Sequence, residues 1–167
     1  MNERKSSTQT TRLAVGGLLT ALIFIFTYFI KLPAPPNGYI HLGDGIIFLA
    51  GTMIGPFAAV CAGLGSALAD MAGNYVVYIV PTFAIKAVMG AIAGLMLPGA
   101  HWFKRLVALL LAEIVMVGGY ALVETWMFGG AAALAAIPMN LIQGAAGVLL
   151  GMPLCALGSR LKPRLMI

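Results

Sequence analysis

The sequence has few charged residues, and this shortage excludes a soluble domain. Lys, Arg, Asp and Glu make up 9% of its 167 residues, whereas soluble domains carry about 25%. Hydrophobic residues make up 61% of the chain, and the mean hydropathy is +1.00. A chain this short cannot bury so much apolar surface in a core of its own, so lipid must solvate most of it. The sequence therefore predicts an integral membrane protein with a single domain covering residues 1–167.

Catalytic, redox and nucleotide-binding motifs are missing as well. Cys61 and Cys155 both lie inside apolar segments and no CxxC occurs, which indicates buried side chains rather than a disulfide or a metal site. The sequence contains no Walker motif, no H-E-x-x-H and no paired-aspartate phosphotransfer motif. The net charge of +5 comes from small basic clusters at helix ends, which does not indicate a nucleic-acid partner. We expect no enzyme, no bound cofactor or metal, and no ATPase activity of the chain itself.

What the chain does contain is a series of apolar segments. They predict an all-α membrane protein, a bundle of about six transmembrane helices. The predicted helices run over residues 11–30, 46–54, 57–72, 77–97, 106–128 and 137–157, with a polar tail at residues 1–10 and a small-residue connection at 129–136.

The basic residues predict the orientation of this bundle. With an even number of spans both termini share one side, and that side collects nearly all Lys and Arg: Arg4, Lys5, Arg12, Lys104, Arg105, Arg160, Lys162 and Arg164. The opposite side holds Lys31 alone. By the positive-inside rule both termini, including the tail at residues 1–10, are cytoplasmic. We expect a multi-pass protein of a bacterial cytoplasmic membrane.

The segment from Lys31 to His41 cannot form a helix. Its three prolines remove backbone donors and fix φ, and Asn37-Gly38 favours a turn. Loops of this length between membrane helices are often functional. We expect residues 31–41 to form an extracellular lid over a site.

Three ionisable residues interrupt the apolar segments. Asp70, Lys86 and Glu113 lie within predicted helices, where each costs about 2.5–3.5 kcal/mol at the bilayer centre. Either a structural Asp–Lys pair locks two helices, or these residues belong to a pocket for a small polar molecule. Asp70 and Glu113 are both candidate partners for Lys86. Asp44, between two glycines, either caps the following helix or contacts a ligand.

Polar side chains gather in the outer half of the predicted bundle, while the inner half is nearly all apolar. This asymmetry favours a solute pocket that opens outward and is closed below, rather than a polar pore. Glu124 shares the outer half, and Lys86 and Glu113 lie somewhat deeper. The candidate ligand-binding residues are Tyr39, His41, Asp44, Asp70, Asn74, Tyr75, Tyr78, Lys86, Glu113, Trp126, Asn140 and Gln143.

Five motifs occur in an order that resembles one family of membrane proteins. They are Tyr39-Ile40-His41-Leu42-Gly43-Asp44-Gly45, Gly55-Pro56, Gly65-Ser66-Ala67-Leu68-Ala69-Asp70, Pro81-Thr82-x-x-Ile85-Lys86 and Pro138-x-Asn140-x-x-Gln143-Gly144. Together they resemble the S component, the substrate-binding subunit, of an energy-coupling factor (ECF) vitamin transporter. The resemblance implies capture of a vitamin or precursor from outside and docking onto a transmembrane coupling protein. Two partner ABC-type ATPases would hydrolyse the ATP.

The resemblance also implies a docking surface and a substrate class. The family's small-residue pattern on the first helix falls on Ala14, Gly17 and Ala21, with Gly17 in place of a frequent alanine. The subgroup with Leu-Gly-Asp-Gly resembles carriers of hydroxymethylpyrimidine, pantothenate or pyridoxine. If acidic partners neutralise Lys86, a pyrimidine or pyridine is favoured; a free Lys86 would favour anionic pantothenate.

Two other functions fit the same residues. A stand-alone secondary transporter would use Asp70, Lys86 and Glu113 as a proton relay. A ligand-free assembly subunit would use the same charges only to pair helices. Uptake that requires an ATPase partner would exclude the first alternative, and binding of a vitamin to the purified chain would exclude the second.

Overall fold

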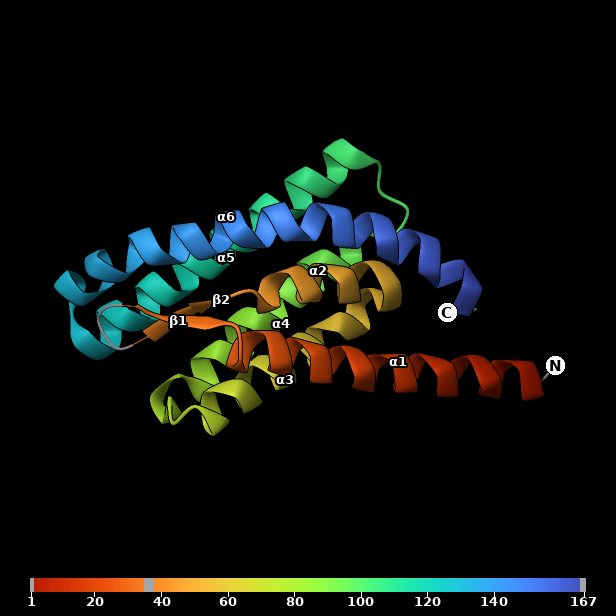
Figure 1. Cartoon of the computed structure of the whole chain (residues 1–167), viewed down its shortest axis with the longest axis horizontal. Coiled ribbons are helices and arrows are strands. Elements are labelled where there is room, and N and C mark those ends of the chain that lie inside the picture. The colour runs from red at the N-terminus through yellow and green to blue at the C-terminus, as the bar shows by residue number, and fades with distance from the viewer. Residues whose placement is uncertain (1, 35–37, 166–167) are drawn as a thin grey trace.

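Helices running back and forth along one long axis make up most of the molecule (Figure 1). The computed structural model describes residues 2–34 and 38–165, with side chains from Gln9 to Pro163. The α-helices in these ranges are α1 (Asn2–Tyr28), α2 (Gly43–Ile54), α3 (Ala58–Ala72), α4 (Ile79–Met96), α5 (Trp102–Phe128) and α6 (Gly130–Leu161). Two strands, β1 (Lys31–Ala34) and β2 (Gly38–His41), separate α1 from α2. Short 3-10 turns lie at Gly55–Phe57, Val76–Tyr78 and Lys162–Leu165.

The described helices confirm an all-α membrane protein. Five segments are long and apolar enough to cross a membrane: Gln9–Tyr28, Gly43–Ala72, Val76–Met96, Trp102–Phe128 and Gly130–Leu161. The second of these joins α2 and α3 through the turn at Gly55–Phe57. At 1.5 Å per residue the 12 residues of α2 extend about 18 Å, well short of the roughly 30 Å hydrocarbon core. Six separate crossings therefore stay a prediction.

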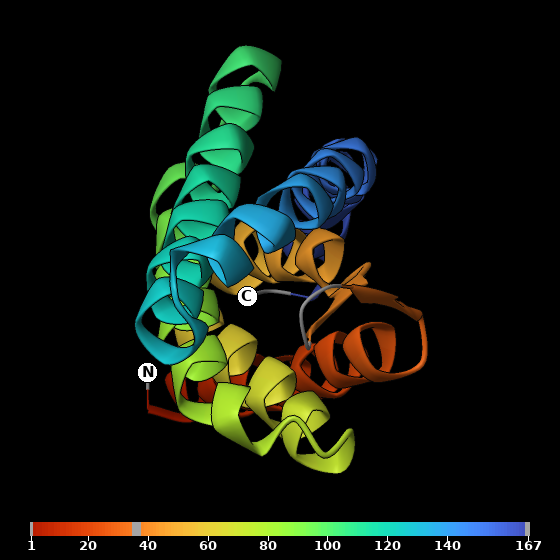
Figure 2. The same cartoon turned by 90° about the vertical axis from the view of Figure 1, so that its left-hand side faces the viewer.

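Helix α2 lies at the centre of the bundle. All of its residues from Gly43 to Ile54 are buried, and it packs against α1, α3, α4 and α6. Figure 2 shows the other helices arranged around it in a view along the bundle from the hairpin end. A helix that is apolar on every side is expected in such a position. The central place of α2 puts its first turn directly beneath the hairpin.

Glycines bring the backbones of neighbouring helices into contact at the end of the bundle away from the hairpin. A Cβ atom on Gly90 of α4 would lie 2.6 Å from the carbonyl oxygen of Ala58, and one on Gly51 of α2 would lie 2.5 Å from the Cβ of Ala93. Such close approach is the usual means of helix association in lipid, where van der Waals contact replaces the hydrophobic effect.

The largest differences from the predicted helix boundaries lie at the starts of α1, α5 and α6. The expected polar tail is helical from Asn2 onward, and α5 begins at Trp102 instead of Leu106. The expected connection at residues 129–136 is helical from Gly130, and only Gly129, with φ 90°, breaks the backbone. Alanine occupies most of residues 131–136 and has the highest helix propensity, so a single glycine suffices as the turn.

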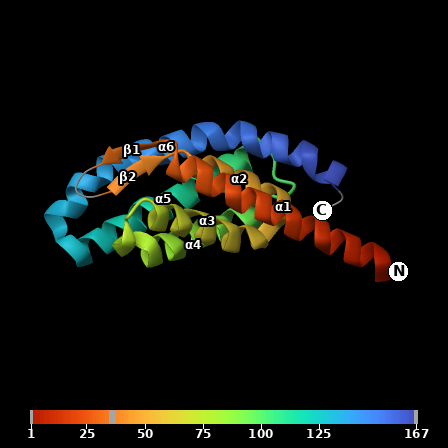
Figure 3. The same ribbon diagram turned by 60° about the horizontal axis from the view of Figure 1, so that its bottom comes forward.

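The segment after α1 is confirmed as non-helical and forms an antiparallel hairpin. Lys31 pairs with His41 and Ala34 pairs with Gly38. Figure 3 shows the hairpin beside the first half of α6. The ammonium of Lys31 lies 4.5 Å from the ring centroid of Tyr28 and 4.9 Å from that of Tyr39. Pro35, Pro36 and Asn37 of the predicted lid lie outside the described residues.

Both chain termini lie at the end of the molecule opposite the hairpin (Figure 1). Basic side chains gather at the same end: Arg12 donates to the carbonyl of Ile54 at 2.8 Å, and Arg105 donates to Ser159 at 2.9 Å. The side chains of Arg4, Lys5 and Arg164 lie outside those described. This arrangement agrees with the charge asymmetry from which the orientation was predicted, and the cytoplasmic location of the termini stays a prediction.

Candidate ligand pocket

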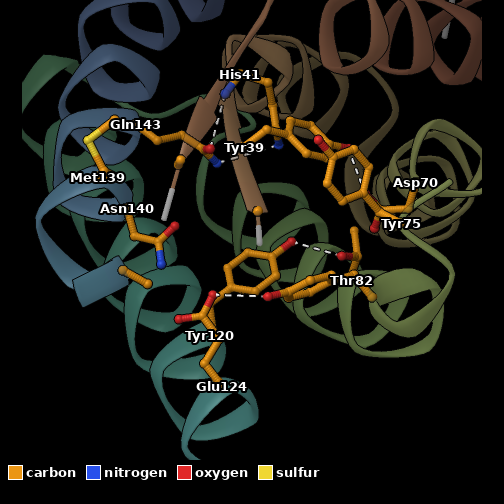
Figure 4. A pocket seen from close by; sticks show the side chains of 14 residues that line it. Tyr39, His41, Asp70, Tyr75, Thr82, Tyr120, Glu124, Met139, Asn140 and Gln143 are labelled. Carbon is orange, nitrogen blue, oxygen red and sulfur yellow. Dashed lines mark hydrogen bonds between the residues drawn. The ribbon is translucent and has the colours of Figure 1, made fainter. Parts of the chain in front are cut away.

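A pocket lies between the hairpin and the adjoining ends of α3, α4, α5 and α6 (Figure 4). The cavity itself is small, about 40 Å³, and lies within about 490 Å³ of space that includes the solvent at its mouth. Its lining residues are Ala34, Gly38, Tyr39, His41, Asp70, Tyr75, Tyr78, Thr82, Tyr120, Glu124, Ala136, Met139, Asn140 and Gln143.

One wall joins the hairpin to the end of α3. The hydroxyl of Tyr39 donates to Oδ1 of Asp70 at 2.6 Å, and the Tyr39 ring lies 4.6 Å from the ring of Tyr75. Burial, with the neighbouring Asp70 carboxylate, raises the pKa of Tyr39 well above its usual value. Tyr39 therefore keeps its proton and acts as the donor to Asp70.

The opposite wall joins α4 to α5. The hydroxyl of Tyr78 donates to Oε1 of Glu124 at 3.5 Å, and the hydroxyls of Thr82 and Tyr120 lie 3.0 Å apart. Glu124 follows Tyr120 by four residues in α5, so the two share a helix face. Tyr78 ends the 3-10 turn that precedes α4, and Thr82 lies in the first turn of α4. All four polar side chains line one space.

Gln143 of α6 ties the hairpin to the core. Its Oε1 accepts from the backbone nitrogen of His41 at 3.1 Å, and its Nε2 donates to Oδ2 of Asp44 at 2.7 Å. Nδ1 of His41 accepts from the backbone nitrogen of Gly43 at 3.0 Å, which places the ring proton on Nε2. Burial lowers the pKa of His41 to about 3, so the ring is neutral at physiological pH.

Lys86 pairs with Asp44, which corrects the predicted partners. The distance from Nζ to Oδ1 is 2.5 Å, and both side chains are completely buried. The prediction that Asp70 or Glu113 is the partner was wrong, because the Lys86 ammonium reaches Asp44 at the start of the central helix α2. The helix-cap interpretation of Asp44 was wrong too, since Leu42 occupies the N-cap without a side-chain bond. The pair lies beneath the pocket and not in its lining.

The structure brings seven of the twelve candidate residues into the pocket lining: Tyr39, His41, Asp70, Tyr75, Tyr78, Asn140 and Gln143. Three others lie away from it. Asn74 is an exposed turn residue with φ 62°, and Trp126 is 87% exposed on the outside of α5. Glu113 is buried against Gly144 and Gly147 of α6. None of these three lines the pocket, and their role as ligand contacts stays a prediction.

Besides Ala34, Gly38 and Ala136, four lining residues were absent from the candidates: Thr82, Tyr120, Glu124 and Met139. The i, i+4 spacing of Tyr78 with Thr82 and of Tyr120 with Glu124 could have revealed the first three. No comparable signal marks Met139, because a methionine in an apolar helix is ordinary.

The predicted docking residues lie on an open face of α1. Ala14, Gly17 and Ala21 are exposed, and a Cβ atom on Gly17 would have no neighbour within 4 Å. The adjacent Gly16 differs, because a Cβ atom there would lie 2.6 Å from the ring of Phe57. The small residues thus do not form an internal seam with the part of the chain that the structure describes.

Comparison with known proteins gives the family. Residues 7–159 match the family described as ECF-type riboflavin transporter, S component. The chain belongs to this family. An S component is a transport subunit of a multi-pass membrane protein complex and is not itself an enzyme.

Two relatives cover nearly all of this S component. The thiamine precursor transporter HmpT of Lactococcus lactis subsp. cremoris (strain MG1363) is 30% identical over 160 residues, which is 95% of this chain and 92% of the relative. A protein of Pyrococcus woesei described as "Uncharacterized protein in gap 3'region" is 34% identical over 146 residues, 86% of this chain and 96% of the relative. Membership of the family and these relatives support a vitamin-type substrate-capture subunit.

Proposed function

We propose that this S component captures a small pyrimidine- or pyridine-type vitamin precursor, with hydroxymethylpyrimidine or pyridoxine ahead of pantothenate. The observation that carries the proposal is the pocket beneath the hairpin, which combines aromatic rings and acidic side chains and has no Lys or Arg among its described lining residues. The thiamine precursor transporter HmpT, to which the chain is 30% identical, supports the same substrate class.

Aromatic side chains suit the pocket to a flat ring. Four of the lining residues are tyrosines: Tyr39, Tyr75, Tyr78 and Tyr120. The Tyr39 and Tyr75 rings are tilted by 49° to each other, so a ligand ring can stack on one and meet the edge of the other. Binding sites of this kind join an apolar wall to a few convergent polar groups that fix orientation.

The charges in the lining disfavour an anionic ligand. Asp70 and Glu124 both contribute carboxyl groups, and the nearby cation of Lys86 is paired with Asp44. Lys31 lies over the rings of Tyr28, Tyr39 and Tyr75 rather than in the lining. A carboxylate such as that of pantothenate would meet like charges without a partner, which raises its free energy in a site of low dielectric.

The exposed face of α1 supports the rest of the proposed assembly. Ala14, Gly17 and Ala21 would dock onto the transmembrane coupling protein, and two ABC-type ATPases bound to that protein would hydrolyse ATP. The hairpin end would face the outside of a bacterial cytoplasmic membrane. Small residues without neighbours permit the close backbone approach on which helix association in lipid depends.

Equilibrium binding to the purified chain tests the capture function. Hydroxymethylpyrimidine, pyridoxine, pantothenate and riboflavin are titrated in detergent, riboflavin because the family description names it. We expect the pyrimidine or pyridoxine to bind most tightly, and Asn140→Ala to weaken that binding roughly tenfold or more. Trp126→Ala, on the outer face of α5, is the matched control and should bind normally. Absence of binding by both the pyrimidine and pyridoxine would refute the proposal.

Uptake measurements test the alternatives. In cells or vesicles that contain the chain alone, we expect binding without accumulation. Accumulation driven by a proton gradient without ATPase partners would instead identify a secondary transporter.

A further inference from the structure

Three buried polar atoms of the pocket have no hydrogen-bond partner among the described residues. They are Oδ2 of Asp70, Oε2 of Glu124 and Nδ2 of Asn140. Asp70 is 2% exposed, Glu124 4% and Asn140 9%. Buried polar groups nearly always have a hydrogen-bond partner. A buried group without a partner loses much of the free energy that water would have given it. Three such atoms around one space indicate groups kept available for a ligand.

The three atoms form a pattern of two acceptors and one donor. Figure 4 shows Asp70 on the α3 side of the space, and Glu124 and Asn140 on the α5 and α6 sides. A carboxylate oxygen accepts hydrogen bonds, whereas the amide nitrogen of Asn140 donates. The complementary ligand therefore carries donors on two of its edges and an acceptor that faces Asn140.

The two carboxyl groups differ in how many oxygens they offer. Asp70 has already accepted a short bond of 2.6 Å from Tyr39, which leaves one oxygen. Glu124 receives only a long bond of 3.5 Å from Tyr78, so both oxygens can accept from a ligand. A single hydroxyl donor suits Asp70. An amino group beside a protonated ring nitrogen, which donates two parallel bonds, suits Glu124.

We infer that Glu124, Asp70 and Asn140 are the specificity-determining residues of this pocket and select an aminopyrimidine with a hydroxymethyl substituent. Glu124 accepts from the amino edge, Asp70 accepts from the hydroxymethyl group, and Asn140 donates to a second ring nitrogen. This inference rests on the proposed capture function and names the chemical groups by which the site selects its substrate.

A series of analogues tests the inference on the unchanged protein. The parent compound, 4-amino-5-hydroxymethyl-2-methylpyrimidine, is compared with an analogue that lacks the amino group and one with methyl in place of hydroxymethyl. We expect each analogue to bind roughly tenfold to a hundredfold more weakly than the parent, because it leaves a buried carboxylate oxygen unsatisfied. Equal affinity of all three compounds would overturn the inference.

Variants then assign each group to its residue. In Glu124→Gln, removal of the amino group should cost little further affinity, while removal of the hydroxyl keeps its full effect. In Asp70→Asn, removal of the hydroxyl should cost little further affinity, while removal of the amino group keeps its full effect. Trp126→Phe, two residues from Glu124 and exposed, should retain the behaviour of the unchanged chain. If removal of the amino group lowers affinity by the same factor in Glu124→Gln and in the unchanged protein, the assignment is wrong.

The two proposals fail in different ways. Tight binding of pyridoxine together with no binding of the parent pyrimidine would overturn this inference and leave the capture function standing. No binding of any of these compounds would refute the capture function itself, and the specificity assignment with it.

Discussion

Asp44 and Lys86 form an ion pair beneath the pocket. Both side chains are fully buried, and neither charge would be tolerated there alone. Asp44 occupies the first turn of α2, where the helix dipole favours a negative charge, and Gln143 donates a further bond to it. The pair therefore links α2, α4 and α6 beneath the pocket.

Removing one partner should destabilise the protein strongly. Lys86→Met leaves the Asp44 charge buried without compensation, so we expect a loss of about 3–5 kcal/mol in the free energy of unfolding. Thermal unfolding in detergent measures this as a lowered midpoint. The double variant Asp44→Asn with Lys86→Met removes both charges and should regain part of the loss. A double variant no more stable than Lys86→Met would show that the charge is not the cause.

His41 gives the protein a predictable dependence on pH. Burial lowers its folded-state pKa to about 3, against about 6.5 in an unfolded chain. The unfolded chain therefore binds a proton below pH 6.5 while the folded chain does not. The resulting stabilisation is complete above pH 6.5 and is lost as the pH falls toward 3. At pH 5 the loss amounts to about 2 kcal/mol.

Thermal unfolding at pH 7 and pH 5 measures this effect. His41→Gln, which has no titrating ring, should show a smaller difference between the two values of pH than the unchanged chain. The same difference in both proteins would assign the pH dependence to other groups.

At the scale of single elements, helix α1 has two different faces, which its adjacent glycines Gly16 and Gly17 mark. Gly16 packs against Phe57 and Cys61 of the bundle, whereas Gly17 has no neighbour within 4 Å of a Cβ position. Leu13 and Leu18 beside it are 64% and 61% exposed. One face of α1 thus belongs to the core, and the other is available to lipid or to a partner.

These neighbouring glycines make a matched pair of variants. Gly17→Leu should leave folding and ligand affinity unchanged but prevent copurification with the coupling protein, because the added side chain blocks close helix contact. Gly16→Leu should instead destabilise the chain, since its side chain would overlap the Phe57 ring. Thermal unfolding, ligand titration and copurification separate the two. Intact assembly with Gly17→Leu would place the docking surface elsewhere.

Sequence patterns predicted the helices better than the contacts between them. Apolar segments and prolines identified the helices and the non-helical segment after α1, because hydropathy and backbone chemistry act locally. The partner of Lys86 could not be predicted in this way. Asp44 lies 42 residues away, and only the central position of α2 brings the two together. Glu124 was placed in the outer half but not in the site, because its role depends on the face that α5 turns inward.

For the molecule as a whole, the orientation in the membrane is the main prediction left to test. A thiol at Leu32, which is 65% exposed on the hairpin, should react with a membrane-impermeant maleimide in intact cells. A thiol at Lys104, exposed near the opposite end, should react only after the membrane is opened. The native Cys61 and Cys155 are buried, so we expect little labelling of these two thiols by the maleimide. The reverse pattern of labelling would invert the predicted topology.

The backbone contacts at Gly51 and Gly90 also have a mechanical consequence. With helix backbones touching, α2, α3 and α4 cannot slide past one another without a steric clash, so this end of the bundle behaves as a stiff pivot. Gly65 of α3, where a Cβ atom would lie 2.7 Å from the carbonyl oxygen of Thr20, adds α1 to the same block. We expect entry and exit of a ligand to be accommodated by hinging of the hairpin and of the outer ends of α5 and α6, while the face that Gly17 presents keeps its shape.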